Sequence, residues 1–125
     1  LLAEDNPGNQ LLFRTILEKE GLVVDVVSDG QEAIDACREI AYDLVLMDVS
    51  MPDVDGLMAT REIRATNSPC SQIPIIALTA HQLDGDRERF LAAGMNDYLG
   101  KPVEKEALLS MIGQWVTMSN QAEMS

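Results

Sequence analysis

Short apolar runs alternate with longer segments of helical period along this chain. Each run is only a few residues long and rich in Leu, Ile or Val, which favours buried strands. The longer segments repeat apolar residues three and four positions apart, which is the spacing of one helix face. The pattern predicts strands at residues 1–3, 23–27, 44–47, 75–78 and 98–99. It predicts helices at residues 7–20, 31–40, 57–65, 87–93 and 105–118.

The first and the last predicted helix each show an apolar face. In the first helix, Leu12, Ile16 and Leu17 are predicted to share the buried side. In the last helix, the equivalent positions are Leu108, Met111, Ile112, Trp115 and Val116. Both helices are therefore expected to pack one side against a core.

The order of the elements predicts the fold class. Five strand–helix units with nearly continuous apolar strands indicate a parallel sheet that is covered on both faces. Gly21 and Gly94 follow helical segments where a left-handed cap favours glycine, and Pro7 stands where a helix start tolerates it. We expect an α/β, doubly wound sheet of five parallel strands with five helices. Residues 1–118 would form the domain, and residues 119–125 a tail or linker.

Composition and charge exclude several functional classes. Nine basic and 21 acidic residues give a net charge of −12, which argues against nucleic-acid binding. Cys37, expected in the core, and Cys70, expected in a polar loop, form no metal or disulfide spacing, which favours the reducing cytoplasm. No apolar run is long enough to cross a membrane, and no signal peptide opens the chain, so we expect no membrane contact by this domain. Because the sequence begins without Met, we expect a fragment with a shortened first strand.

Polar side chains follow four of the five predicted strands. Glu4 and Asp5 follow the first strand, Asp48 the third, Thr79 the fourth and Lys101 the fifth. In an open parallel sheet, ligands bind beyond the carboxyl ends of the strands. Crowded carboxylates repel one another unless a cation intervenes, and an all-oxygen site suits Mg²⁺. An aspartate beside such a cation, a lysine and a threonine is typical of a phosphoryl acceptor.

Several residues near the predicted strand ends also have a purely structural interpretation. Thr79 could be an ordinary β-branched strand residue, Tyr98 an ordinary aromatic at a strand end, and Lys101 a solvated turn residue. Asp53, Asp55 and Gly56 are best explained as turn and helix-start residues, and Trp115 and the seven methionines as core or surface residues. His81 is the only histidine, and no cluster of cysteine and histidine suits zinc.

The chain resembles the receiver domains of bacterial two-component response regulators over essentially its whole length. The segments that carry the resemblance are "AEDNPGNQ", "DLVLMDVSMPDVDG", "PIIALTA" and "GMNDYLGKPV". Together they are specific, and their sequences most resemble those of receivers of hybrid sensor histidine kinases. The resemblance implies a flavodoxin-like fold with strand order 2-1-3-4-5. It also implies a histidine kinase or a histidine phosphotransfer domain as partner. The expected location is the cytoplasm, which includes the cytoplasmic part of a membrane-anchored kinase. A dimer that forms on phosphorylation is an open alternative.

The resemblance also implies a role for each site residue. Asp48 would accept the phosphoryl group, Asp5 would bind Mg²⁺ directly, and Glu4 would act through water. The main-chain carbonyl of Ser50 would complete the protein ligands of the metal. Lys101 would pair with the phosphoryl group. Thr79 would be the switch hydroxyl, and the rotamer of Tyr98 would follow the movement of Thr79. The bond between Lys101 and Pro102 would be cis.

Small departures from the family pattern and the rival functions complete the prediction. Gly8 stands where relatives often carry a larger side chain, and Met58 where a polar residue is frequent, so Met58 is expected to be exposed. A degenerate receiver that only docks a partner is the alternative, but no site residue is missing. An aspartate-based phosphatase would need a second carboxylate where Ser50 stands. A flavin or nucleotide protein would need a glycine-rich first turn.

Overall fold

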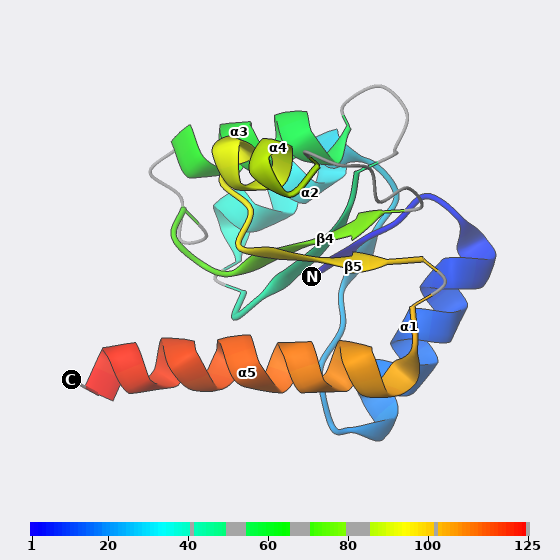
Figure 1. Ribbon diagram of the computed structural model, residues 1–125. Coiled ribbons are helices and arrows are strands. Elements are labelled where there is room, and N and C mark those ends of the chain that lie inside the picture. Colours follow the sequence, from blue (N-terminus) through cyan, green and yellow to red (C-terminus); the bar gives the residue numbers. More distant parts are fainter. Residues whose placement is uncertain (41, 50–54, 66–70, 80–85, 102, 125) are drawn as a thin grey trace.

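The structure, a computed structural model, describes residues 1–40, 42–49, 55–65, 71–79, 86–101 and 103–124 as one parallel sheet between two helical layers (Figure 1). The strands are β1 (Leu2–Ala3), β2 (Val26–Val27), β3 (Val45–Asp48), β4 (Ile75–Thr79) and β5 (Asp97–Gly100). The helices are α1 (Pro7–Lys19), α2 (Gly30–Glu39), α3 (Gly56–Ala65), α4 (Asp86–Ala93) and α5 (Lys105–Met124). The sheet order β2-β1-β3-β4-β5, parallel throughout, confirms the predicted fold class.

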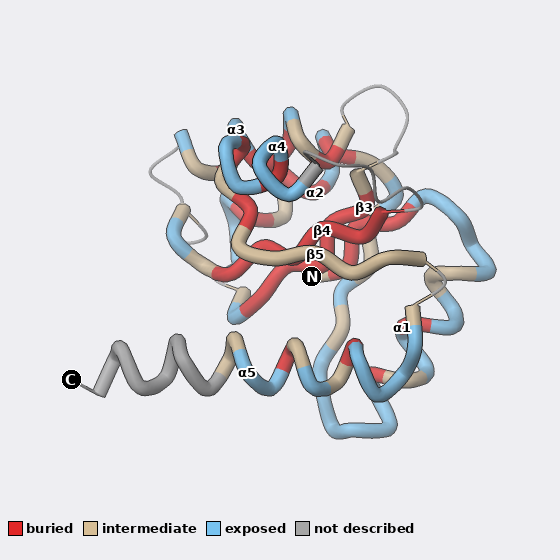
Figure 2. Tube along the Cα trace, viewed as in Figure 1, coloured by how far each residue is buried: buried red, intermediate tan, exposed pale blue. Residues whose placement is uncertain are grey.

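Alternate residues of the strands supply two separate apolar cores, because successive side chains of a strand point to opposite faces. Helices α2, α3 and α4 cover one face of the sheet, and α1 and α5 cover the other (Figure 1). The strand residues under α2, α3 and α4 are Ala3, Val45, Met47, Ile75 and Ala77. Those under α1 and α5 are Leu2, Leu46, Ile76 and Leu78. The buried strands β3 and β4 form the centre of the molecule (Figure 2).

Several local predictions are confirmed by the structure. Gly21 and Gly94 adopt positive φ values of 83° and 107°, which the caps of the preceding helices require. Pro7 lies in the first turn of α1, and Cys37 is fully buried. Met58 is exposed, as expected for a position where a polar residue is frequent. The apolar face of α5 packs on the sheet through Leu108 and the four partners predicted with it.

The predicted face of α1 was wrong at one position. Phe13 and Leu17 are the buried residues of this helix, with 3% and 4% exposure, whereas Leu12 is 51% exposed. Ile16 packs at the margin of the same core. Phe13 and Leu17 are four residues apart and share a face, so the helix is rotated by about one residue relative to the prediction. The rotation leaves Leu12 in solvent.

The predicted and observed bounds differ by more than one residue in two places. Helices α1 to α4 begin and end within one residue of their predictions, but α5 continues to Met124 instead of ending at residue 118. Strand β2 is shorter than predicted, because it pairs only with Leu2 and Ala3 of β1. The proposed domain boundary after residue 118 stays a prediction.

A half-buried arginine links three segments at the end of the sheet opposite to the predicted site. Arg64 of α3 donates from Nε to the main-chain oxygen of Gly94 (2.9 Å) and from Nη1 to that of Ser71 (3.0 Å). Its Nη2 donates to Oδ1 of Asn96 (2.8 Å), which also accepts from the main-chain nitrogen of Ile75 (2.9 Å). The guanidinium group therefore holds α3, the start of β4 and the turn before β5 together.

Replacing Arg64 with leucine is expected to lower the free energy of unfolding by about 2–3 kcal/mol, because three partly buried oxygens lose a charged donor. Arg61 lies one turn earlier on α3 and is exposed, so Arg61→Leu should change the stability by less than about 0.5 kcal/mol. Urea denaturation of both variants measures the difference. Equal losses in the two variants would show that the Arg64 network does not stabilise the fold.

Candidate functional site

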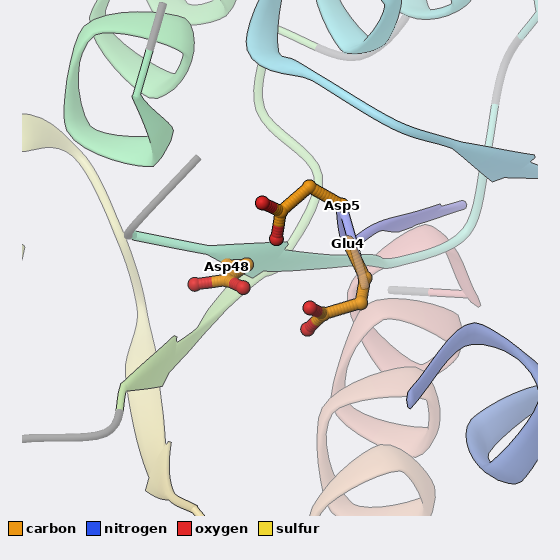
Figure 3. Close-up of side chains that lie close together, drawn as sticks. All are labelled: Glu4, Asp5 and Asp48. Atoms are coloured by element: carbon orange, nitrogen blue, oxygen red, sulfur yellow. The ribbon is translucent and has the colours of Figure 1, made fainter. Parts of the chain in front are cut away.

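Three carboxylates converge beyond the carboxyl ends of β1 and β3. Glu4 and Asp5 directly follow β1, and Asp48 is the last residue of β3. The two strands are neighbours and run parallel, so their ends meet at the same edge of the sheet. One oxygen of each carboxylate lies within 4.8 Å of the others, and the three groups surround one space (Figure 3). The structure therefore brings together the three acidic residues that the sequence singled out.

The three carboxylates differ in exposure. Glu4 is 1% exposed and Asp48 is 2% exposed, whereas Asp5 faces solvent. Burial raises the pKa of Glu4 above its usual value, the hydrogen bond from Lys101 opposes that rise, and the charge of Asp48 adds to it. The site thus combines a buried pair of acids with one solvent-facing acid at its mouth.

Lys101 joins the two buried carboxylates. Its Nζ donates to Oδ2 of Asp48 at 2.7 Å and to Oε2 of Glu4 at 2.8 Å. Burial alone would lower the pKa of the Lys101 ammonium, but the hydrogen bonds to Asp48 and Glu4 outweigh it and raise the pKa. The lysine is therefore held in its charged form, between Glu4 and the predicted acceptor. It is not the solvated turn residue of the structural interpretation.

The end of β4 lies beside the lysine. Thr79, the last residue of β4, is 4% exposed. Its main-chain oxygen accepts a hydrogen bond from the main-chain nitrogen of Lys101 at 2.7 Å. Thr79 pairs with Gly100 in the sheet, and this places the next residue, Lys101, beside the end of β4. The predicted threonine and lysine thus stand at one edge of the sheet together with the acids.

Tyr98 lies farther from the acids, on the outer strand β5. It is half-buried, and its ring centroid is 5.8 Å from that of Phe90 on α4, with the rings inclined by 54°. This contact makes Tyr98 part of the packing between β5 and α4. The structure does not bring Tyr98 into the acidic group itself.

Two residues that support the site, Asn6 and Gly56, were not predicted in this role. Asn6 caps α1 through its side chain, which accepts from the nitrogen of Asn9 (3.1 Å), while its own nitrogen donates to Oε1 of Glu4 (3.2 Å). Gly56 lies so close to the chain at Asp48 that an added Cβ would stand 2.9 Å from the Cα of Val49. The pair of Asn6 and Pro7 was a cap signal that could have identified Asn6. Nothing in the sequence indicates the close approach of Gly56.

Asp55 has the role that the sequence predicts for it, since its Oδ1 accepts from the nitrogen of Met58 (2.9 Å) at the start of α3. Other predictions fall on positions that the structure does not describe. These are the carbonyl of Ser50, the bond to Pro102, the turn at Asp53, the loop at Cys70 and the position of His81.

The acidic group fits a small divalent cation. Within the described residues it is the one group of three or more acidic, histidine or cysteine side chains that could hold a metal ion. All its donors are carboxylate oxygens, which suit Mg²⁺, and neither of the ligand types that zinc prefers takes part. The solvent-facing Asp5 leaves room for the waters that Mg²⁺ retains.

Comparison with known proteins decides the family. The family model of the response regulator receiver domain matches residues 1–113. The chain belongs to the receiver domain family. This confirms the resemblance inferred from the four sequence segments, and it places the acidic group at the edge of a receiver domain.

The relatives of this receiver domain include sensor kinases. It is 42% identical to the sensor protein GacS of Pseudomonas syringae pv. syringae over 95% of its length, but it spans only 13% of GacS. It is 46% identical to the receiver domain of a sensor histidine kinase from Pseudomonas aeruginosa, with a TM-score of 0.86 and coverage of 93% and 94% of the two chains. That structure has a magnesium ion coordinated in its active site cleft.

A third neighbour is part of a signalling complex. The receiver domain is 32% identical to a chain from the Saccharomyces cerevisiae complex between the histidine phosphotransfer protein Ypd1 and the receiver domain of the response regulator Ssk1. The TM-score is 0.85, and the match covers 94% of this chain and 88% of that one. Across the described residues of the receiver domain, no helix is both long and apolar enough to span a membrane.

Proposed function

We propose that this receiver domain accepts a phosphoryl group on Asp48 in the presence of Mg²⁺ and changes conformation to relay a signal. The observation that carries the proposal is the environment of Asp48. Its carboxylate is buried, yet one oxygen is already held by the Lys101 ammonium at 2.7 Å, and a solvent-facing acid stands beside it. A buried aspartate with a fixed cation on one side is suited to attack an incoming phosphorus atom.

The donor would be a phosphohistidine of a histidine kinase or of a histidine phosphotransfer domain. An oxygen of the Asp48 carboxylate attacks phosphorus and forms the new P–O bond. The P–N bond of the phosphohistidine breaks, and its electron pair stays on the imidazole nitrogen. The complex of a related receiver with Ypd1 supports a phosphotransfer protein as the partner class.

Lys101 would remain in the site after the transfer. Its ammonium lies between Asp48 and Glu4, so it can turn toward a phosphoryl oxygen without leaving the site. Electrostatic stabilisation of the transferred group is the main task of a protein in phosphoryl transfer. We assign this task to Lys101.

The acidic group would hold the cation that the reaction needs. Asp5 and Asp48 would bind Mg²⁺ directly, Glu4 would act through water, and the main-chain carbonyl of Ser50 would complete the set. Glu4 suits an indirect role, because both of its oxygens already accept hydrogen bonds, from Asn6 and Lys101. When bound, Mg²⁺ supplies positive charge that offsets the negative charge of the phosphoryl oxygens and the carboxylates.

Thr79 and Tyr98 would carry the conformational response. Thr79 is buried at the end of β4, next to Lys101, where its hydroxyl can turn toward a phosphoryl oxygen. Movement of this strand end would change the packing of Tyr98, which contacts Phe90 of α4. A local charge change would thereby shift the balance between two arrangements of β5 and α4.

The parent protein would be a hybrid sensor histidine kinase that acts in the cytoplasm, because the curated relatives are sensor kinases much longer than this chain. Phosphorylation-dependent dimerisation stays a prediction that sedimentation of both forms can test.

The rival function is a receiver that only docks a partner. It is disfavoured because Glu4, Asp5, Asp48 and Lys101 form a complete charged site.

Incubation with acetyl phosphate tests the proposal directly. We expect a slower-migrating phosphorylated band on a phosphate-affinity gel when Mg²⁺ is present and no such band when EDTA replaces it. A phosphorylated histidine phosphotransfer protein, used as the second donor, should give the same band. If the protein binds Mg²⁺ but neither donor gives a band, the docking function is correct instead.

A further inference from the structure

Gln10 of α1 lies across the turn that carries Glu4 and Asp5. Its side-chain Nε2 donates a short hydrogen bond to the main-chain oxygen of Glu4. The same nitrogen lies 3.3 Å from Oγ of Ser28, just after β2, and can donate to it as well. Gln10 is half-buried, and its main-chain nitrogen is fixed by the oxygen of Asn6 (2.9 Å). One amide therefore links the ends of β1 and β2 to the first turns of α1.

The bond to Glu4 fixes the peptide group that leads into Asp5. The oxygen that Gln10 holds belongs to the peptide unit between these two residues, and that unit is planar. Fixing it limits the direction in which the Asp5 side chain leaves the backbone. Within the described part of the chain, the Asp5 side chain takes part in no hydrogen bond or ion pair that would orient it. Its position in the acidic group is therefore set by the backbone at Asp5 and by the rotamer of its own side chain.

The other end of the Gln10 bridge is anchored as well. The main-chain nitrogen of Ser28 donates to Oε1 of Glu32 (3.3 Å), and the nitrogen of Glu32 donates to Oδ1 of Asp29 (2.8 Å), which caps α2. Ser28 is therefore tied to the first turn of α2. Gln10 connects the acidic turn to this second, separately held point.

We propose that Gln10 is a positioning residue that sets the Mg²⁺ affinity of the acidic site by fixing the peptide between Glu4 and Asp5. The inference rests on the proposed function, because it takes the acidic group as the Mg²⁺ site. Without the amide donor, the turn samples more directions, and ordering Asp5 around the cation costs conformational entropy. Residues that orient metal ligands from outside the site change metal affinity by about 10- to 100-fold.

Gln10→Leu removes the amide nitrogen that makes both hydrogen bonds and keeps an apolar side chain that is one atom shorter. In NMR titrations of the full chain with MgCl₂, we expect about tenfold weaker Mg²⁺ binding than in the wild type. Gln31→Leu is the matched control, since Gln31 of α2 donates to Oδ1 of Asp35 (3.2 Å) and takes no part in the acidic turn. The control should bind Mg²⁺ within about twofold of the wild type.

Stability and affinity are measured separately. Urea unfolding in EDTA gives the stability of each variant without metal, so a purely structural role would lower that stability and leave the affinity of the folded protein unchanged. If Gln10→Leu does not fold, Ser28→Ala decides, because it removes only the outer anchor. It should weaken Mg²⁺ binding by about threefold, a smaller effect than that of Gln10→Leu.

The outcomes separate this inference from the proposed function. Wild-type Mg²⁺ affinity in folded Gln10→Leu, or in Ser28→Ala when Gln10→Leu does not fold, overturns the role of Gln10 and leaves phosphoryl acceptance standing. A wild type that binds Mg²⁺ but takes no phosphoryl group overturns the proposed function and leaves the role of Gln10 standing. A wild type without Mg²⁺ binding overturns both.

Discussion

Replacing Lys101 with methionine is expected to lower the free energy of unfolding by about 3 kcal/mol in the absence of Mg²⁺. The physical reason is that Glu4 and Asp48 are both nearly inaccessible to solvent and both form an ion pair with this ammonium. Removing it takes the Lys101 charge away from two buried carboxylates that lie close together. The Lys101 side chain keeps 19% exposure, so water relieves part of the penalty and the loss stays at the lower end of the range for buried pairs.

The Lys101 prediction has a matched control and a metal dependence. Lys105→Met removes an exposed lysine at the start of α5, and its unfolding free energy should change by less than about 0.5 kcal/mol. Added Mg²⁺ should stabilise Lys101→Met more than the wild type, because the carboxylates then lack their fixed cation. Urea unfolding with and without Mg²⁺ measures both effects. Equal stabilities of the two variants in EDTA would contradict the role given to Lys101.

Gly56→Ala is expected to cost about 2–3 kcal/mol of stability and to disturb the site as well. An added Cβ would overlap the main-chain oxygen of Asp48 and stand 2.9 Å from the Cα of Val49. These are backbone atoms at the end of β3, so no flexible side chain can move aside. Either the start of α3 or the end of β3 has to shift, and the second shift moves the predicted phosphoryl acceptor.

Gly113→Ala is the matched control for Gly56→Ala. Gly113 lies within α5, and an added Cβ would meet no atom within 4 Å. Alanine should therefore stabilise this helix by about 0.5–1 kcal/mol. We expect a lower thermal midpoint and weaker Mg²⁺ binding for Gly56→Ala, and a higher midpoint with unchanged Mg²⁺ binding for Gly113→Ala. A Gly56→Ala protein as stable as the wild type would show that the close approach is not tight.

The site could be predicted from the sequence because a parallel sheet follows simple rules. Once the apolar runs are taken as parallel strands, the residues after them must meet at one edge. Glu4, Asp5 and Asp48 do so, and Lys101 and Thr79 join them at the same edge. The charges at that edge then predict a divalent cation and a phosphoryl acceptor. No side-chain contact had to be known in advance.

The contacts that hold the site in place could not be predicted in the same way. The bridge from Gln10 to Glu4 and the network of Arg64 join segments whose separation in space depends on the assembled fold. The burial of Phe13 in place of the predicted Leu12 has the same cause. A rotation of α1 by one residue is too small to read from an apolar pattern that both positions satisfy, and docking on the sheet decides it.

The end of α5 shows a limit of a different kind. The sequence after residue 118 is polar, which suggested a tail, but it contains neither glycine nor proline to end a helix. The helix continues to Met124, beyond the predicted end (Figure 1). Polarity alone predicts exposure rather than the loss of helical structure.

Intact mass after incubation with acetyl phosphate and Mg²⁺ tests the role of Asp48 most directly. The proteins to compare are the wild type, Asp48→Asn and Asp55→Asn, in which asparagine can still cap α3 as Asp55 does. We expect one phosphoryl adduct on the wild type and on Asp55→Asn, and none on Asp48→Asn. An adduct of equal yield on Asp48→Asn would contradict the assignment of Asp48 as the phosphoryl acceptor.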